Sequence, residues 1–204
     1  MDIFPRDKKK IQQRIKNYES ALRKEEREHG SIGDGYGKRY LLGPLYLLAE
    51  DTHGALKHYT WFEETFPDDS GDPWHRFCWA ITLLRSGDHK GSVQKMYQAM
   101  FIDLFFLCFV VTSRIDEIPR FDGHDEYKAA QALDTPQDLI DILSKEEKLW
   151  LTKFWEHPMI VERRNSYLAL EKKLKSVSPG PERNALLKTL YALRDSHWLP
   201  DVTY

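Results

Sequence analysis

The chain has 204 residues, of which 41% are hydrophobic, 13% aromatic and 30% charged, and its 30 basic residues nearly balance 32 acidic ones. This length and aromatic content suffice for one domain with a sizeable core, and they exclude a chain that is disordered throughout. The formal net charge of −2 excludes the strongly basic surface of a dedicated nucleic-acid binder, so no nucleic-acid partner is expected.

Cysteine usage and hydropathy predict a soluble, cytoplasmic protein. Cys78 and Cys108 are too few for a disulfide framework, and neither belongs to a CxxC pair. The first ten residues contain no apolar stretch of the kind that a secretory signal needs. The most apolar run, residues 100–111, includes Asp103 and is shorter than the roughly 20 residues that span a bilayer. We therefore expect it to form a buried core helix and expect no membrane association.

The first predicted element is an amphipathic helix within residues 1–30. Its apolar residues recur at spacings of four, three and four among charged neighbours, which places them on one helical stripe: Ile11, Ile15, Tyr18 and Leu22. Gly30 predicts the end of this helix, and residues 31–37, with three glycines, predict a flexible connection.

Four helical patterns follow in close succession, over Lys38–Glu50, His53–Phe66, Pro73–Arg85 and His89–Asp103. The breaks between them are short and polar. Thr52 and Asp88 are predicted as N-caps because their side-chain oxygens can accept hydrogen bonds from free amides of the next turn. Pro73 suits a first helical turn, where no amide donor is needed.

The remainder of the chain also has helical periodicity. Residues 112–124 are irregular and predict a boundary between subregions, and a short helix is expected over Asp125–Leu133. Ser144 and Glu147 match a capping box. Two further helices are expected, one ending near Ser176 and one over Glu182–Arg194. Because period-two alternation is absent, the predicted fold class is all-α, with regions at 1–30, 36–112 and 125–199 that we expect to form one compact unit.

Two consecutive helix pairs match each other at an offset of 37 residues, which indicates a helical repeat. In each pair a small residue follows a large one on the first helix, and a second small residue comes twelve positions later. These small residues are Gly43 and Ala55 in the first pair, and Ala80 and Ser92 in the second. Small side chains at these positions allow antiparallel helices to approach closely, so we expect the helices to cross there.

The first pair resembles the tetratricopeptide repeat (TPR) family through residues at the family's signature spacings: Leu42, Gly43, Tyr46, Ala55, Tyr59 and Pro67. The resemblance covers about residues 36–107 and implies a short right-handed superhelix, capped by the N-terminal helix and by residues 101–111. Three departures are present in the first unit, where Arg39 replaces the leading tryptophan, Phe62 replaces a small residue, and Pro44 should kink or shorten the first helix.

No catalytic, metal-binding or cofactor-binding motif is legible, so we expect neither an enzyme nor a cofactor. None of the eight histidines forms an HxxxH or HExxH pattern, and His53 and His58 should diverge on a helix. Adjacent carboxylates such as Glu63 and Glu64 point about 100° apart on a helix and do not converge on one atom. No glycine-rich phosphate-binding loop follows a predicted strand.

The TPR resemblance also implies a binding surface on the first helix of each pair. Carried onto this chain, the partner-binding residues are Tyr40, Leu47 and Leu48, then Trp74, Phe77, Ile81, Leu84 and Arg85. Such a surface is apolar with one cation, which suits an amphipathic helix or an extended peptide. An equally open alternative is that the chain's own N-terminal helix covers this groove, with residues 31–37 acting as a hinge.

Two functions follow as expectations. The first is a non-catalytic adaptor or scaffold that binds a protein or peptide partner through the TPR-like groove. The alternative is an immunity-type or effector-associated protein, which neutralises or regulates one dedicated partner through a charged surface away from the groove. An open apolar groove would favour the adaptor, whereas a patch of one charge sign would favour the alternative.

Overall fold

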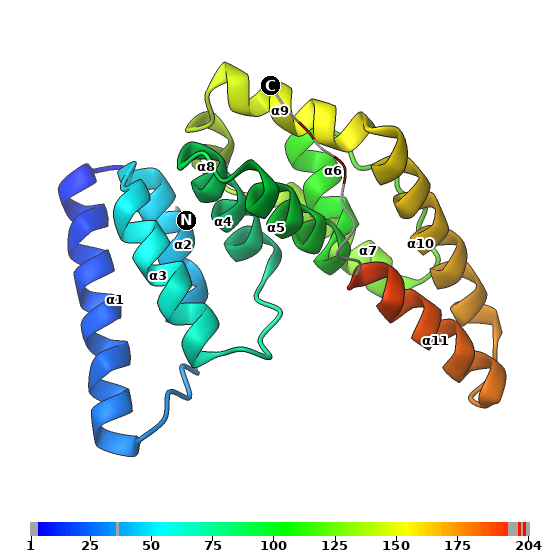
Figure 1. The fold of residues 1–204 in the computed structure, drawn as a ribbon, viewed down its shortest axis with the longest axis horizontal. Coiled ribbons are helices and arrows are strands. Elements are labelled where there is room, and N and C mark those ends of the chain that lie inside the picture. Colours follow the sequence, from blue (N-terminus) through cyan, green and yellow to red (C-terminus); the bar gives the residue numbers. More distant parts are fainter. Residues whose placement is uncertain (1–3, 36, 196–199, 201, 203–204) are drawn as a thin grey trace. The chain divides into compact units, whose positions relative to one another are not determined.

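The computed structural model describes all residues except 1–3, 36, 196–199, 201 and 203–204. The described residues form eleven helices and no strand, which confirms the all-α fold class (Figure 1). The first five helices are α1 (Lys8–His29), α2 (Lys38–Ala49), α3 (Thr52–Thr65), α4 (Pro73–Arg85) and α5 (His89–Ile102). They are followed by α6 (Leu104–Thr112), α7 (Gly123–Leu133), α8 (Gln137–Asp141), α9 (Lys145–Glu156), α10 (Pro158–Ser176) and α11 (Pro181–Arg194).

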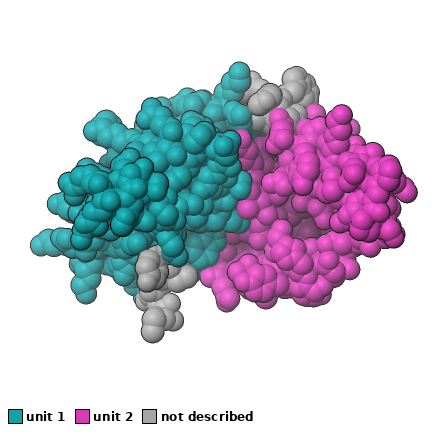
Figure 2. Space-filling model, turned by 90° about the horizontal axis from the view of Figure 1, so that it is seen from below, with its two compact units in different colours: residues 1–95, 136–143 teal, residues 96–135, 144–204 magenta. Residues whose placement is uncertain are grey.

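The chain divides into two compact units (Figure 2). Unit 1 consists of residues 1–95 and 136–143, and unit 2 consists of residues 96–135 and 144–204. The boundary therefore falls inside α5, and the short segment that contains α8 belongs to unit 1 although unit 2 precedes and follows it in the sequence. These boundaries differ from the three regions expected from the sequence, because periodicity marks helices but not which helices pack together.

Local sequence signals account for most helix ends. Asp88 accepts a hydrogen bond from the Gly91 amide at 2.8 Å, which confirms the predicted N-cap of α5. The capping box of α9 is also confirmed, with Ser144 and Glu147 each accepting from the other's amide. The expected cap at Thr52 is wrong. Asp51 accepts from the Gly54 amide at 2.8 Å instead, because its carboxylate lies one residue earlier and reaches the same turn.

The apolar run at residues 100–111 was expected to form one helix, but it contains the end of α5 and most of α6. It breaks at Asp103, which accepts from the amides of Phe105 and Phe106 and so begins α6 as its N-cap. The axes of α5 and α6 differ by 117° across this break. No single helix of the described residues has the length and apolar character to cross a bilayer, and this bent pair meets the criteria only when both helices are taken together.

Unit 1 is built on α2, which packs against α1, α3, α4 and α8. Figure 1 shows α1, α2 and α3 as neighbouring helices. Its core is rich in aromatic rings, and Tyr59 of α3 stacks on Trp79 of α4 with ring centroids 4.7 Å apart. Gly43 of α2 makes this packing possible, because an added Cβ would lie 2.5 Å from the Tyr59 hydroxyl and 3.4 Å from His75 Cδ2. The close approach at Gly43 is thus to Tyr59 and His75.

The second helix pair has the close contact expected at its small residues. Ala80 of α4 and Ser92 of α5 are both fully buried. The Ser92 hydroxyl donates a 2.8 Å hydrogen bond to the Ala80 carbonyl, so this side chain meets the backbone of the facing helix. A larger residue at position 92 would force α4 and α5 apart.

Unit 2 contains α6, α7, α9, α10 and α11. Within it α6 packs against α7 and α9, and α10 packs against α9 and α11. Two hydrogen bonds tie distant parts of its sequence together. The Trp150 indole donates to the Val202 carbonyl at 3.1 Å, and the Tyr97 hydroxyl donates to the Leu193 carbonyl at 2.7 Å.

Candidate functional site

Half of the residues expected to line a partner-binding groove are interior residues of unit 1. Leu47, Phe77, Ile81 and Leu84 are buried, with relative exposures of 4% or less, so they present no surface to a partner in this structure. Tyr40, Leu48, Trp74 and Arg85 are half-buried. All eight residues lie on α2 and α4, and only the four half-buried ones keep appreciable exposed surface.

Segments of the chain itself lie against this surface. The Phe4 ring packs on Trp74 with centroids 6.3 Å apart, and Phe4 is only 3% exposed. The Arg85 guanidinium donates to the Ile142 carbonyl at 3.3 Å, and α8 packs on α2. Residues before α1 and residues 136–143 therefore contact residues that were expected to line the groove.

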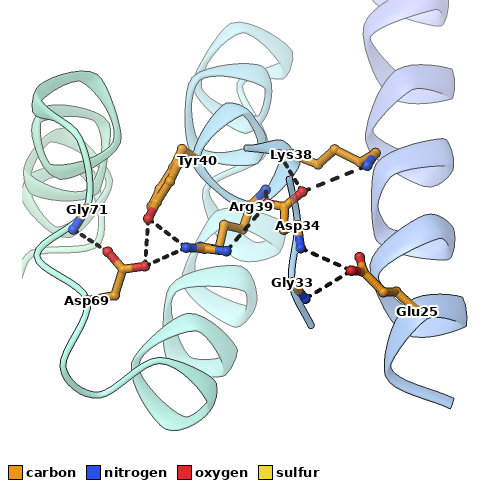
Figure 3. Close-up of polar contacts among 8 residues, drawn as sticks. All are labelled: Glu25, Gly33, Asp34, Lys38, Arg39, Tyr40, Asp69 and Gly71. Carbon is orange, nitrogen blue, oxygen red and sulfur yellow. Dashed lines mark hydrogen bonds and ion pairs between the residues drawn. The ribbon is translucent and has the colours of Figure 1, made fainter. Parts of the chain in front are cut away.

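The polar residues at the start of α2 form a connected network (Figure 3). Asp34 is buried and accepts hydrogen bonds from the amides of Lys38 at 2.9 Å and Arg39 at 2.8 Å. Since the N-cap residue Gly37 has no side chain to offer, the Asp34 carboxylate caps α2 from a distance. Its own backbone has a φ of 41°, in the left-handed region that aspartate and asparagine tolerate better than most residues.

The connection at residues 31–37, which was expected to be flexible, makes hydrogen bonds to α1 in its described part. Glu25 of α1 accepts from the amides of Gly33 at 2.9 Å and Asp34 at 3.1 Å (Figure 3). These bonds fix the loop to the C-terminal half of α1, and Asp34 fixes it to α2. The glycines predicted a flexible segment. The sequence alone does not reveal that the carboxylates of Glu25 and Asp34 accept hydrogen bonds here.

Arg39, which stands where a TPR has tryptophan, links α2 to the loop before α4. Its guanidinium donates to Asp69 at 3.0 Å and to the Tyr40 hydroxyl at 2.8 Å, and it lies 4.5 Å from the centre of the Phe66 ring. Burial acts to raise the pKa of Asp69, but the hydrogen bonds from Tyr40, Gly71 and Arg39 outweigh it and lower that pKa. Tyr40, expected to face a partner, is therefore engaged inside the protein by Asp69.

A cavity of about 240 Å³ lies where α1, α2 and α3 meet, and sequence reasoning did not predict it. Its lining comes from all three helices: Glu19, Leu22, Arg23, Leu42, Lys57, His58 and Trp61. His58 is 4% exposed, and its Nε2 has no hydrogen-bond partner among the described residues. The only sequence signal for this feature was a histidine on the buried face of α3, which is not by itself distinctive.

A second buried histidine, His75, lies near His58 with ring centroids 5.8 Å apart. Both of its ring nitrogens lack hydrogen-bond partners within the described part of the chain. Burial lowers the pKa of His75 well below its ordinary value, and nearby positive charge adds to this effect. His75 contacts Phe62 and Tyr59 in the aromatic core and does not line the cavity.

The described residues contain no group of three or more His, Cys, Asp or Glu side chains arranged to hold a metal ion. Comparison of this chain with protein-family profiles, with curated proteins and with solved structures finds no match.

Proposed function

We propose that this protein is a non-catalytic adaptor that binds a protein partner through the groove formed by α2 and α4. The observation that carries the proposal is that this surface already holds polypeptide: Phe4 on Trp74, and the Ile142 carbonyl on Arg85. An aromatic anchor and a main-chain hydrogen bond are the two means by which peptide-binding grooves usually hold extended segments. The close contacts of Gly43 with the Tyr59 side chain and of Ser92 with the Ala80 carbonyl lend support to a TPR-like scaffold.

The chemistry of the partner follows from these internal contacts. A partner segment with a large aromatic side chain would take the place of Phe4, and its backbone carbonyl would accept from Arg85. Because residues 136–143 are tethered to the groove, they compete with such a segment and lower its apparent affinity. We place the protein in the cytoplasm, in keeping with its two buried, unlinked thiols at Cys78 and Cys108.

Site-specific photo-crosslinking in the native cell tests this proposal. A photoreactive phenylalanine analogue is placed at Leu48 or Trp74 in the groove, and at exposed Glu64 on α3 as a matched control. We expect adducts from the two groove positions only, competed by a synthetic peptide of residues 134–145. Equal adducts from position 64, or adducts that the peptide does not compete, would contradict a groove-binding partner.

The contact between Phe4 and Trp74 offers a second test. Phe4→Ala removes the anchor on Trp74 and should raise the crosslinking yield at position 48 several-fold, because the competing contact is weakened. Met159→Ala, in unit 2, is the matched control and should leave the yield unchanged. A yield that falls with Phe4→Ala would mean that Phe4 supports the groove instead of competing for it.

The alternative is a protein that neutralises one dedicated partner by charge. The observation in its favour is the first turn of α1, where exposed Lys8, Lys9 and Lys10 follow one another. A photoreactive residue at Lys9 tests it in the same experiment. Adducts from position 9 that weaken as the salt concentration rises, with none from the groove, would favour this alternative.

A further inference from the structure

The cavity between α1, α2 and α3 has an apolar floor. Leu22 of α1 and Leu42 of α2 are buried at 2% and 1% exposure, and the half-buried Trp61 of α3 forms a flat wall. Its volume of about 240 Å³ is below the roughly 300–1,000 Å³ of pockets that take drug-sized ligands. The cavity therefore suits a ligand of about one bicyclic ring.

An unpaired buried nitrogen belongs to one of the residues that line this apolar site. His58 has a hydrogen bond with the backbone of Arg39, and its Nε2 has no partner among the described residues. Burial lowers the pKa of His58 to about 4, so the imidazole is neutral at pH 7. With one ring nitrogen engaged by the backbone as donor, Nε2 carries a free lone pair. A buried acceptor without a partner is costly, and a ligand that donates a hydrogen bond removes that cost.

The charged residues at the rim do not favour a cationic ligand. Glu19 accepts from the Tyr46 hydroxyl at 2.5 Å through one carboxylate oxygen and from Arg23 at 2.8 Å through the other. Both oxygens are thus engaged, and Arg23 and Lys57 at the rim disfavour a cation by repulsion. A matching ligand therefore needs one neutral hydrogen-bond donor attached to an apolar ring.

We propose that this cavity is a binding site for a neutral, planar aromatic group with a single hydrogen-bond donor, an indole or a phenol. Its ring packs between Leu22, Leu42 and Trp61, and its N–H or O–H donates to His58 Nε2. The group can come from a free small molecule or from a tryptophan or tyrosine side chain of a protein. This site is separate from the α2–α4 groove, so its failure leaves the proposed function untouched.

Binding of indole and indene to the full chain, followed by NMR, tests the proposal. Indene has the same ring outline but carries a CH₂ in place of the N–H donor. We expect indole to bind at least tenfold more tightly than indene, which corresponds to one hydrogen bond to an otherwise unpaired buried acceptor. The ¹⁵N resonance of His58 Nε2 should shift on addition of indole and not on addition of indene.

Variants separate the hydrogen bond from the cavity itself. His58→Phe keeps an aromatic ring and removes the acceptor, so indole affinity should fall about tenfold to the level of indene. Glu64→Ala, exposed on α3 and outside the cavity lining, is the matched control and should change neither affinity by more than about twofold. N-acetyl-tryptophanamide distinguishes the sources: if it binds like indole the site accepts a protein side chain, and if it does not while indole does, the ligand is a free molecule.

Absence of indole binding to the wild-type chain, or equal binding of indole and indene, would overturn the proposal. These two outcomes need no variant, so they remain decisive even if His58→Phe fails to fold.

Discussion

At the scale of single residues, His58 and His75 are the groups whose environment differs most from water. Both rings are buried among Tyr59, Phe62 and their aromatic neighbours, with relative exposures of 4% for His58 and 0% for His75. Charging either ring inside this core would cost desolvation energy, which for His58 exceeds the stabilisation from its hydrogen bond with the Arg39 backbone. Both histidines therefore couple folding to pH.

Acidification should destabilise the protein through His58. Burial lowers its pKa from 6.5 to about 4, so between these pH values the unfolded chain binds a proton that the folded chain does not. The stability that neutral His58 provides is fully present above pH 6.5 and is lost as the pH falls toward 4. From pH 7.5 to pH 5.0 the loss should be about 2 kcal/mol, at about 1.4 kcal/mol per pH unit below 6.5.

Urea unfolding of the wild type and of His58→Phe at both pH values measures this loss. Burial raises the pKa of Asp72 to about 6, which acts with the opposite sign, but this effect is common to both proteins and cancels in their difference. The phenylalanine variant should lose about 2 kcal/mol less than the wild type over the same interval. Identical losses would show that His58 is accessible to protons in the folded state.

Gly43 is the residue at which the helix packing of unit 1 is most sensitive to size. Gly43→Ala should lower the free energy of unfolding by about 1–3 kcal/mol, because its methyl group would overlap the buried Tyr59 hydroxyl. Gly35→Ala, where an added Cβ meets no atom within 4 Å, is the matched control. Tyr59→Phe should restore part of the stability in the double variant, since it removes the nearest atom. Chemical denaturation of the wild type, Gly43→Ala, Tyr59→Phe and the double variant measures the coupling between the two positions.

At the scale of elements, nearby carboxylates cap the starts of several helices. Asp51, Asp88 and Asp103 each accept from amides two or three residues ahead, as N-caps do. In α2 the capping carboxylate is more distant, because Asp34 lies four residues before the first helical residue. Short-range sequence patterns thus predict caps that directly precede a helix. A carboxylate that caps a helix from across a loop can be identified only from the tertiary structure.

Asp34→Ala should destabilise the N-terminal turn of α2, because it removes the cap. Loss of the two hydrogen bonds to the amides of Lys38 and Arg39 should cost about 2 kcal/mol, since each involves a buried carboxylate. Hydrogen exchange of these two amides should accelerate more than that of amides elsewhere in α2. Asp34→Asn keeps an acceptor and tolerates the positive φ, so it should lower the stability less than Asp34→Ala. If Asp34→Asn lowers the stability as much as Asp34→Ala, the negative charge and not the acceptor stabilises the helix start.

At the scale of the whole molecule, residues 136–143 belong to unit 1 although they are enclosed in the sequence by unit 2. Leu139 and Leu143 are buried, and the Ile142 carbonyl accepts from Arg85. The segment should therefore lose its structure together with α1–α4. It should not follow α9, which begins directly after it at Lys145.

Native-state hydrogen exchange on a unit 1 variant tests this assignment. Leu22→Ala removes a buried side chain of α1 and should destabilise unit 1 by about 2–5 kcal/mol. Amides of residues 139–143 should then exchange faster by the same factor as those of α2 and α4, while the amides of Trp150–Phe154 in α9 change less. Exchange at 139–143 that follows α9 would contradict the division into these two units.

The sequence by itself determined the fold class and nearly every helix, because helical periodicity, caps and proline positions are local properties of the chain. It also identified Ala80 with Ser92 as a close contact, since two small residues at matched positions have few other uses. It did not determine which segments contact Trp74 and Arg85, that Glu25 binds the amides of Gly33 and Asp34, or that His58 borders a cavity. Those features depend on residues far apart in the sequence meeting in space, and only the tertiary structure decides which carboxylate, ring or carbonyl arrives there.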